Sequence, residues 1–331
     1  MKKVLITGAA GFIGSHTALA LCQQGDEVVG YDNFNSYYSV ELKREREKRL
    51  ADAGISIIEG DLCDAARMEA LFNEHNFTHV LNLAAQAGVR YARKDPQAYV
   101  KSNIEGFVNV LECLKSRPHI KLVYASSSSV YGCNEKTPFS TDDRVDSPAN
   151  LYAATKKSNE LMAYAYHHLY GMETVGLRYF TVYGPWGRPD MAYFSFAEAI
   201  MRDEPIHLFN QGKMWRDFTY IDDAVQGTVA ALNYPHSAVF NIGNSKTEEL
   251  LTFVSILEKE LGKEAKKIFV EESPGEMIKT SADISAATRE LGFLPHTNLK
   301  NGLQKFAAWY LRHYEKKTSA CTSVNHGVIA C

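Results

Sequence analysis

Residues 4–14 are Val4-Leu5-Ile6-Thr7-Gly8-Ala9-Ala10-Gly11-Phe12-Ile13-Gly14, a short apolar run followed at once by three regularly spaced glycines. A helical pattern of apolar residues continues to Gln24, and a second apolar run, Glu27–Tyr31, ends at Asp32. This order of strand, glycine turn, helix, strand and acid predicts the first β–α–β unit of a doubly wound parallel sheet.

The same unit predicts a dinucleotide site. Glycines let the backbone turn tightly and approach a pyrophosphate, and the helix N-terminus offers amide groups to its phosphates. Asp32 lies 24 residues after Gly8, where an acid can accept the adenosine ribose hydroxyls. Its charge would repel the extra phosphate of NADP, so we expect NAD. A plain tight turn is the alternative, but the strand, helix and acid around the glycines argue against it.

Composition limits the other classes of function. The chain has 331 residues, of which 45% are hydrophobic and 23% charged, as in ordinary globular proteins. The net charge is −3 and there is no long basic run, so we expect no nucleic-acid partner and no membrane partner. No apolar stretch approaches the length of about 18 residues that a membrane span needs.

Cysteine and histidine placement is typical of a cytoplasmic protein without a metal. Six cysteines are scattered without a CxxC pair, and no signal peptide is present, so we expect reduced thiols and a cytoplasmic location. His75 and His79 are four residues apart but lack an HExxH frame, so we expect no metal site.

Apolar runs alternate with helical patterns as far as about residue 180. This alternation predicts an α/β, Rossmann-like, doubly wound parallel sheet, in which ligands bind at the carboxyl ends of the strands. Strands are expected at Lys3–Thr7, Glu27–Tyr31, Ser56–Glu59, His79–Leu83, Lys121–Ala125 and Thr174–Arg178, and helices at Phe12–Gln24, Val40–Ala53, Ala65–Glu74, Pro96–Ser116 and Leu151–Leu169.

The regular alternation of strands and helices ends near Gly184, where a loop containing Pro185, Gly187 and Pro189 begins. We therefore expect an NAD-binding domain over residues 1–184, with some later segments returning to it, and a smaller C-terminal α/β substrate-binding region over 185–317. Residues 318–331 are small and polar without a period, which predicts a disordered tail. Helices of the second region are expected at Phe194–Arg202, Asp222–Leu232, Glu248–Leu261, Ile284–Leu291 and Leu299–Arg312.

A tyrosine and a lysine begin the helix after the fifth strand, in Tyr152-Ala153-Ala154-Thr155-Lys156. Residues four apart share one face of a helix, so both side chains point into the same space. A lysine cation near a phenol lowers the pKa of the phenol, which predicts that Tyr152 acts as a general base near neutral pH. Because this spacing is common by chance, it needs support from neighbouring residues.

That support comes from the serine run 126–129, which leaves the fifth strand and precedes Val130-Tyr131-Gly132. Hydroxyls at the carboxyl end of such a strand face the ligand crevice, where a serine can hydrogen-bond a substrate oxygen whose proton moves. A polar turn with satisfied hydroxyls is the alternative interpretation. Four serines do not all take part in the chemistry.

On these residues the chain, as far as about Tyr314, resembles the extended short-chain dehydrogenases/reductases of the nucleotide-sugar epimerase/dehydratase group. The glycine spacing GxxGxxG is also similar to that superfamily. Ser127, Tyr152 and Lys156 match the Ser/Thr, Tyr and Lys of the group. Ser127 is chosen because it lies four residues before Tyr131 and 25 before Tyr152, while the other serines of the run stay open.

The resemblance also implies a set of cofactor-binding residues. Asp61-Leu62 resembles the adenine contact, Leu83–Ala87 resembles the loop beside the pyrophosphate and ribose, and Asn103 resembles the helix asparagine that supports the active site. The full set implied for NAD is Gly8, Gly11, Phe12, Ile13, Gly14, Asp32, Asn33, Asp61, Leu62, Leu83, Ala84, Ala85, Asn103, Tyr152, Lys156 and Tyr179.

Two further segments resemble substrate-binding parts of the group. The block 216–223 resembles a second-domain signature whose arginine, here Arg216, contacts the UDP diphosphate. As an alternative, Arg216 pairs with Asp217 or Asp222. The run 273–276 resembles a Pro-Gly-Asp segment that holds the nucleoside ribose, with Glu276 in place of the usual aspartate.

Members of the group share the hydride step and differ in the chemistry after it. Dehydratases usually carry an Asp-Glu pair where this chain has Ser128-Ser129, and decarboxylases carry a glutamate at the second position, so both reactions are disfavoured. The segments 31–35, 85–90 and 178–192 resemble UDP-glucuronate 4-epimerases, with Thr181 where the glucose enzymes have asparagine. The resemblance therefore implies NAD-dependent 4-epimerisation of UDP-glucuronate to UDP-galacturonate through a transient 4-keto intermediate.

An acidic substrate needs an anion site, for which Arg188, Thr181 and the serine hydroxyls are candidates. A loop arginine in solvent, or on the diphosphate, is the alternative for Arg188. The substrate-binding set implied is Arg90, Ser127, Ser128, Tyr152, Thr181, Arg188, Arg216 and Glu276.

Two other functions stay open: a 4-epimerase of a neutral or N-acetylated UDP-hexose (UDP-glucose or UDP-N-acetylglucosamine), and a non-catalytic NAD-sensing module. The second is disfavoured because Tyr152 and Lys156 are both retained. The resemblance further implies a homodimer joined through the helices at Pro96–Ser116 and Leu151–Leu169 as a four-helix bundle.

Overall fold

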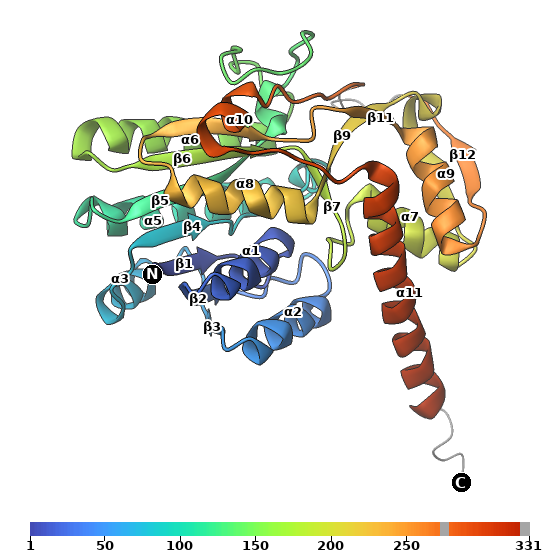
Figure 1. Ribbon diagram of the computed structural model, residues 1–331, viewed down its shortest axis with the longest axis horizontal. Helices are drawn as coiled ribbons and strands as arrows, with labels where there is room; N and C mark the ends of the chain where they lie inside the picture. The colour runs from blue at the N-terminus through green and yellow to red at the C-terminus, as the bar shows by residue number, and fades with distance from the viewer. Residues whose placement is uncertain (272–277, 325–331) are drawn as a thin grey trace.

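The computed structural model describes residues 1–271 and 278–324, and its centre is a seven-stranded sheet whose strands all run parallel (Figure 1). The strand order is β10-β6-β5-β4-β1-β2-β3. The predicted doubly wound α/β sheet is thereby confirmed. The strands are β1 (Lys3–Thr7), β2 (Glu27–Asp32), β3 (Ser56–Glu59), β4 (His79–Asn82), β5 (Lys121–Ser127), β6 (Thr174–Tyr179) and β10 (Ala238–Ile242).

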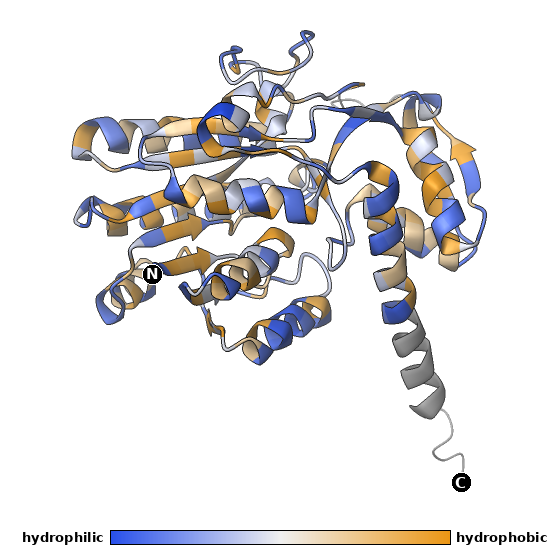
Figure 2. Ribbon diagram, viewed as in Figure 1, coloured by the Kyte–Doolittle hydropathy of each residue, from blue (hydrophilic) through white to orange (hydrophobic). Residues whose placement is uncertain are grey.

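Helices cover both faces of the sheet, which explains why its strands are continuously apolar. In β1, Val4 and Ile6 pack into one apolar cluster while Leu5 packs into the other, on the opposite face. Figure 2 shows the apolar residues concentrated on the central strands. The first face carries α1 (Phe12–Gln23), α2 (Val40–Asp52) and α8 (Ile221–Asn233), and the second carries α3 (Ala65–Glu74), α5 (Gly106–Lys115) and α6 (Leu151–Tyr170).

The second region lies at one end of the sheet (Figure 1). Its three-stranded sheet has the order β11-β9-β7, and a parallel pair, β12 and β8, lies beside it. The strands are β7 (Thr181–Tyr183), β8 (Pro205–Leu208), β9 (Trp215–Tyr220), β11 (Thr247–Glu249) and β12 (Lys266–Phe269), and the helices are α7 (Ala192–Met201), α9 (Leu250–Leu261) and α11 (Leu299–Val324).

Three late segments complete the first region. β10 pairs in parallel with β6, and α8 packs against α1. α10 (Ser285–Leu291), expected in the second region, packs against β10 and α8 instead. Six strands of this sheet are predicted from the sequence, and β10 is missed. Its five residues follow a short Pro-containing turn and do not continue the regular alternation of strands and helices.

The helix predicted over Pro96–Ser116 is interrupted. It begins as α4 (Pro96–Tyr99), passes through a π-helical stretch, η2 (Val100–Glu105), and continues as α5. A π-turn accommodates one extra residue within a helix, so an apolar pattern with a period near 3.6 does not reveal it. Its consequence for the site is the placement of Asn103.

The C-terminal segment also differs from expectation. α11 continues through residues 318–324, where the sequence predicts a disordered tail, and residues 325–331 lie outside the described residues. A helix that has already nucleated over Leu299–Arg312 extends at little cost, because each added residue adds a hydrogen bond. Across the described ranges, no helix combines the length and the apolar character needed to cross a membrane.

Candidate active site

A cavity of about 780 Å³ opens where the parallel strands of the large sheet end. Its wall combines the loops after β1, β2, β4 and β5 with the start of α6, β7, β9 and α7. Every predicted site residue lines this cavity except two. Asn103 lies behind the wall, and Glu276 lies outside the described residues.

The glycine loop after β1 has the backbone that a dinucleotide requires. Gly8 has a φ of +71°, and a Cβ placed on it would lie 2.7 Å from the backbone nitrogen of Ala84. α1 begins at Phe12, and Gly11 supplies no side-chain cap. The first-turn amide groups therefore remain available to a phosphate at the positive end of the helix dipole.

Asp32 ends β2 with its carboxylate fixed at the cavity edge. Its Oδ2 accepts a hydrogen bond from the Ala10 amide at 2.9 Å, and its Oδ1 accepts one from the Phe34 amide at 2.9 Å. Burial raises its pKa, and the two amides together with the Lys43 and Arg46 cations partly offset that rise. Each carboxylate oxygen keeps a second lone pair for a hydroxyl, so the glycine loop and Asp32 fit a dinucleotide.

Asn103 lies behind the cavity wall and hydrogen-bonds its neighbours, and its place in the NAD-binding set stays a prediction. Its Oδ1 accepts the Gln86 amide at 2.8 Å, and its Nδ2 donates to the Gln86 carbonyl and to Thr155 Oγ1, both at 3.0 Å. It is 1% exposed. Asn103 therefore ties the loop after β4 to α6 from behind the cavity wall.

Tyr152 and Lys156 share the first turns of α6, as predicted. The helix begins after Asn150, whose side chain accepts the Ala153 amide at 2.9 Å. The Lys156 ammonium donates to the Ala125 carbonyl at the end of β5, at 2.9 Å. Burial lowers the Lys156 pKa to about 8.

Several neighbours act on the pKa of Tyr152. Burial raises it, a hydrogen bond with Ser127 and the charge of Arg188 act in the lowering direction, and the Asp190 carboxylate acts in the raising direction. The Lys156 ammonium donates to a β5 carbonyl, and its effect on the phenol stays a prediction.

The serine run divides into different roles. Ser126 donates to Glu160 Oε1 at 2.7 Å, within a buried pair in which Arg178 binds Glu160 at 2.8 and 3.0 Å. Ser127 accepts the Ser129 amide at 3.2 Å and hydrogen-bonds Tyr152. Ser127 is thus the serine that reaches the tyrosine, which supports its selection from the sequence.

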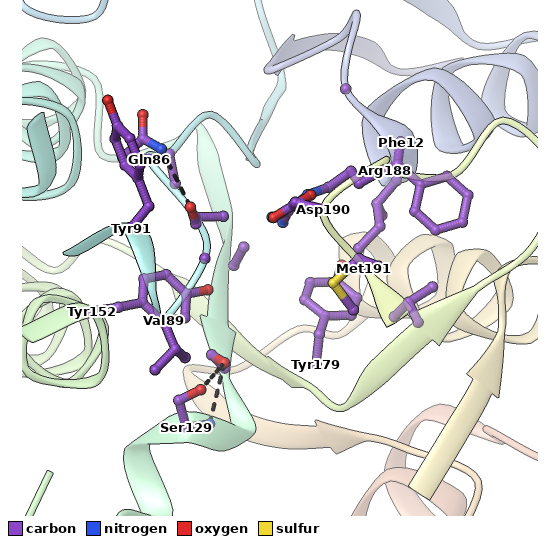
Figure 3. Close-up of a pocket in the computed structure, with 18 of the residues that line it drawn as sticks. Phe12, Gln86, Val89, Tyr91, Ser129, Tyr152, Tyr179, Arg188, Asp190 and Met191 are labelled. Atoms are coloured by element: carbon purple, nitrogen blue, oxygen red, sulfur yellow. Dashed lines mark hydrogen bonds and ion pairs between the residues drawn. The ribbon is translucent and has the colours of Figure 1, made fainter. Parts of the chain in front are cut away.

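Arg188 faces Tyr152 across the cavity, paired with Asp190 (Figure 3). Its Nε donates to Asp190 Oδ1 at 3.0 Å and its Nη2 to Oδ2 at 2.5 Å, and each side chain is 23% exposed. The Tyr37 hydroxyl donates to the same Oδ2 at 3.0 Å. Asp190 and Tyr37 are not predicted from the sequence, because no local pattern distinguishes them from ordinary loop residues.

A buried arginine holds the loop that carries Arg188. Arg46 is 0% exposed and binds the Trp186 carbonyl through Nε and Nη2, at 3.0 and 2.7 Å, and the Gly187 carbonyl at 2.8 Å. Its Nη1 donates to the Ala10 carbonyl of the glycine loop at 3.0 Å. One side chain therefore fixes the cofactor side and the substrate side of the cavity relative to each other.

The remaining predicted substrate residues lie on the far wall. Arg216 donates to the Trp215 and Ile278 carbonyls, at 3.0 and 3.1 Å. Asp217, one of its predicted alternative partners, instead accepts the amides of Asn244, Ser245 and Ala282 at 2.6, 2.9 and 2.9 Å.

Two more predicted residues contribute apolar or stacked surface. The Arg90 guanidinium lies 4.6 Å from the centre of the Phe209 ring. The Tyr179 hydroxyl hydrogen-bonds Thr228 Oγ1 at 2.7 Å, which leaves its ring to line the cavity. Thr181 and Ser128 also lie in the wall. Within residues 1–271 and 278–324, no group of three or more histidine, cysteine or acidic side chains is placed to hold a metal ion.

Comparison with known proteins finds a matching family model and several similar proteins. The model of the NAD dependent epimerase/dehydratase family matches residues 4–243. UDP-glucuronate 4-epimerase 1 of Arabidopsis thaliana is 51% identical over 336 residues, covering 96% of this chain and 78% of the plant protein. Protein CapI of Staphylococcus aureus is 46% identical over 95% of this chain and 100% of its own length.

A solved structure is similar over nearly the same extent. The UDP-glucuronic acid 4-epimerase of Bacillus cereus, in complex with UDP-glucuronic acid and NAD, is 38% identical with a TM-score of 0.88. The match covers 94% of this chain and 100% of the Bacillus chain. The likeness thus includes both the sheet and the second region.

Proposed function

The chain belongs to the NAD dependent epimerase/dehydratase family, and we propose that it catalyses the NAD-dependent 4-epimerisation of UDP-glucuronate to UDP-galacturonate. The Arabidopsis thaliana UDP-glucuronate 4-epimerase 1, 51% identical, and the Bacillus cereus structure support this substrate. The observation that carries the proposal is the cavity itself. It sets Tyr152 on one wall and a guanidinium, Arg188, on the other (Figure 3). Ser127 lines the same cavity.

The NAD-binding side of the cavity follows from the strand ends. Gly8 and the first turn of α1 would hold the pyrophosphate, Asp32 the adenosine ribose, and Asp61 with Leu62 the adenine. Bound there, NAD supplies a hydride acceptor at sugar carbon 4 that gives the hydride back to the opposite face, so no net oxidation occurs.

Tyr152 takes the proton from the sugar 4-hydroxyl and returns it after the 4-keto sugar has turned. Its hydrogen bond with Ser127 aligns the phenol, and the Arg188 cation favours the phenolate. Lys156 is buried, and the Ala125 carbonyl fixes its ammonium against the end of β5. General acid–base catalysis of this kind contributes about 10²–10⁴-fold to the rate.

The carboxylate of the sugar binds Arg188, Thr181 and the Ser128 hydroxyl. The 4-keto intermediate is a β-keto acid and loses carbon dioxide when its carboxyl bond overlaps the carbonyl. Holding the carboxylate close to the plane of the carbonyl prevents that overlap. Region 185–317 supplies this substrate side, with Arg216 on the diphosphate and Glu276 on the ribose.

The proposal includes a homodimer and a cytoplasmic location. Leu161, Tyr164 and Leu169 on α6 are 58%, 70% and 65% exposed, an apolar stripe that a second copy would cover. The described cysteines at 22, 63, 113 and 133 are free thiols, the form that a reducing compartment maintains.

The test is a product assay by NMR with three substrates. Purified protein loaded with NAD should convert UDP-glucuronate to UDP-galacturonate without an added reductant, and should convert UDP-glucose and UDP-N-acetylglucosamine far more slowly. Preferred turnover of a neutral sugar would make the chain a hexose 4-epimerase. Binding without turnover of any sugar would make it an NAD-sensing module.

A further inference from the structure

Three loops from different parts of the chain meet at Asp190. The loop after β2 brings Tyr37, the loop after β4 brings Gly88, and the loop after β7 brings Arg188 and Asp190 itself. All four residues line the cavity. A loop carboxylate inside an anion site requires an explanation, because it opposes the charge that such a site needs.

Asp190 holds Arg188 by one edge. The bonds from Nε and Nη2 place both carboxylate oxygens side-on against that edge, and the Tyr37 hydroxyl donates to Oδ2 as a third partner. Among the described residues Nη1 has no hydrogen-bond partner. The backbone amide of Arg188 also donates to the Tyr193 hydroxyl, at 3.1 Å.

The close approach of these loops depends on a glycine. Gly88 has a φ of +100°, and a Cβ there would lie 2.4 Å from the Tyr37 hydroxyl oxygen and 3.4 Å from Asp190 Oδ2. The Tyr37 ring also packs against Tyr91, with ring centroids 4.7 Å apart. Tyr37 and Asp190 are therefore fixed in place rather than free at a loop surface.

We propose that Asp190, held by Tyr37, is a positioning residue that fixes the Arg188 guanidinium with its remaining edge toward the sugar carboxylate. This inference rests on the proposed function. An arginine loses side-chain rotamer freedom when it binds a ligand, and a guanidinium that is already clamped has little left to lose. The Asp190 carboxylate also neutralises the Arg188 charge in the empty site. The preference for an acidic sugar therefore comes from the oriented N–H donors of Arg188 rather than from a net positive charge.

A competing role is that Asp190 occupies Arg188 until the substrate carboxylate displaces it. Release would take two of the three donors away from Asp190 and leave a partly buried carboxylate with Tyr37 alone. The structure favours the positioning role. The two roles predict opposite effects of neutralising Asp190 on the affinity for the acid.

The test compares Asp190→Asn and Tyr37→Phe with a matched control, Asp146→Asn. Arg144 and Asp146 have the same two-residue spacing, with Nε and Nη2 again donating, but their side chains are 92% and 61% exposed outside the cavity. Calorimetry on the NAD-loaded protein measures the Kd for UDP-glucuronate, UDP-glucose and UDP, and kinetics give kcat and KM.

Asp190→Asn should raise the Kd and KM for UDP-glucuronate by about tenfold, the loss expected for a weakened charge-assisted contact, with the Kd for UDP unchanged. Tyr37→Phe should act in the same direction with a smaller change, and Asp146→Asn should change nothing. Tyr37→Phe keeps the test valid should Asp190→Asn fold poorly.

Tighter binding of UDP-glucuronate by Asp190→Asn would overturn the proposal in favour of the displaced competitor. Equal losses for all three ligands would reduce Asp190 to a structural role, and unchanged affinity would remove any role. A wild-type protein that does not prefer the acid over UDP-glucose would contradict the proposed function, and the inference would fail with it. The two failures are distinguished because one appears in the wild type and the other in the variant.

Discussion

Tyr152 is hydrogen-bonded to Ser127, and its pKa responds to the Arg188–Asp190 pair across the cavity. Arg188, proposed to bind the sugar carboxylate, and Tyr152, proposed to move the proton, are therefore electrostatically connected. A substrate carboxylate on Arg188 would weaken its pull on the phenolate, so recognition of the acid and proton transfer are coupled.

Replacing Tyr152 by phenylalanine removes the proton acceptor and leaves the ring in the wall. We expect kcat to fall by about 10²–10⁴-fold, with the affinity for NAD unchanged, because the glycine loop and Asp32 are untouched. Steady-state kinetics and NAD titration measure the two quantities. Turnover near that of the wild type would exclude Tyr152 as the base.

At the scale of single residues, the sequence predicts which side chains take part in the reaction, but not the electrostatic environment that shifts their pKa values. Tyr152 and Lys156 could be selected because helix periodicity places them on one face. Ser127 could be selected from its run only because its spacing to Tyr131 and Tyr152 resembles that of the family. Asp190 and Tyr37 could not, because their role arises from a contact across 153 residues of chain. The direction of the Tyr152 pKa shift likewise depends on burial and on Arg188, which helical spacing does not show.

At the scale of elements, the turn from β1 to α1 is built around Gly8. Gly25 offers a matched control, because its φ of +84° is similar and nothing lies within 4 Å of a Cβ placed on it. Gly25→Ala should lower the free energy of unfolding by about 1–2 kcal/mol without a change in NAD affinity. Gly8→Ala should also weaken NAD binding, because its Cβ meets the loop at Ala84.

Chemical denaturation and NAD titration of both variants separate strain from steric contact. Equal NAD affinities for the two variants would show that the close approach of Gly8 to Ala84 does not shape the cofactor site.

The serine run at the end of β5 is supported by the buried pair of Arg178 and Glu160. Arg178→Met leaves the buried Glu160 carboxylate with only the more exposed Lys157, at 3.3 Å, as its cation. It should lower the free energy of unfolding by about 3 kcal/mol, the lower end of the range for breaking a buried pair. Arg202→Met is the matched control, since the Arg202–Glu198 pair on α7 has side chains 51% and 35% exposed. Its loss should cost below about 1 kcal/mol. Similar losses in denaturant titrations would contradict the role of burial.

Apolar periodicity in the sequence predicts the strands and helices of the first region, including six of the seven strands of its sheet. The π-helical stretch η2 could not be predicted, because one inserted residue hardly alters the pattern, yet it turns Asn103 toward Gln86 and Thr155. The resemblance implies that Asn103 supports the active site, and the structure gives the contacts through which it holds the cavity wall.

At the scale of the whole molecule, Arg46 joins the two sides of the cavity through carbonyls of both loops. α11 adds to this, because Trp309 packs on Trp186 with ring centroids 5.3 Å apart. The loop that carries Arg188 is thus held by α2 on one side and α11 on the other. No local sequence pattern predicts this connection, because its partners come from three distant segments.

The proposed homodimer is tested by placing charge in the exposed stripe of α6. The double variant Leu161→Glu, Tyr164→Glu should be monomeric, because two carboxylates would be buried without partners. Leu294→Glu is the control, since Leu294 is 61% exposed elsewhere on the molecule. Light scattering coupled to size-exclusion chromatography gives the mass of each. An unchanged mass in the double variant would place the interface elsewhere.

Stability should depend on pH through two partly buried histidines. Burial lowers the pKa of His16 to about 4 and that of His79 to about 4, from an ordinary value near 6.5. The unfolded chain then binds more protons between these values, so the free energy of unfolding is greatest above pH ~6.5 and falls toward pH ~4. Glutamine at both positions should flatten denaturation profiles over that range. An unchanged slope would exclude the histidines as its cause.

The central claim is that one hydride leaves carbon 4 of the sugar and returns to the same carbon within the cavity. UDP-glucuronate carrying deuterium at carbon 4 tests it directly, with the product analysed by NMR and mass spectrometry. The account predicts UDP-galacturonate that retains the deuterium at carbon 4 in ordinary water. Loss of the label to solvent, or release of carbon dioxide with a UDP-pentose as product, would contradict it.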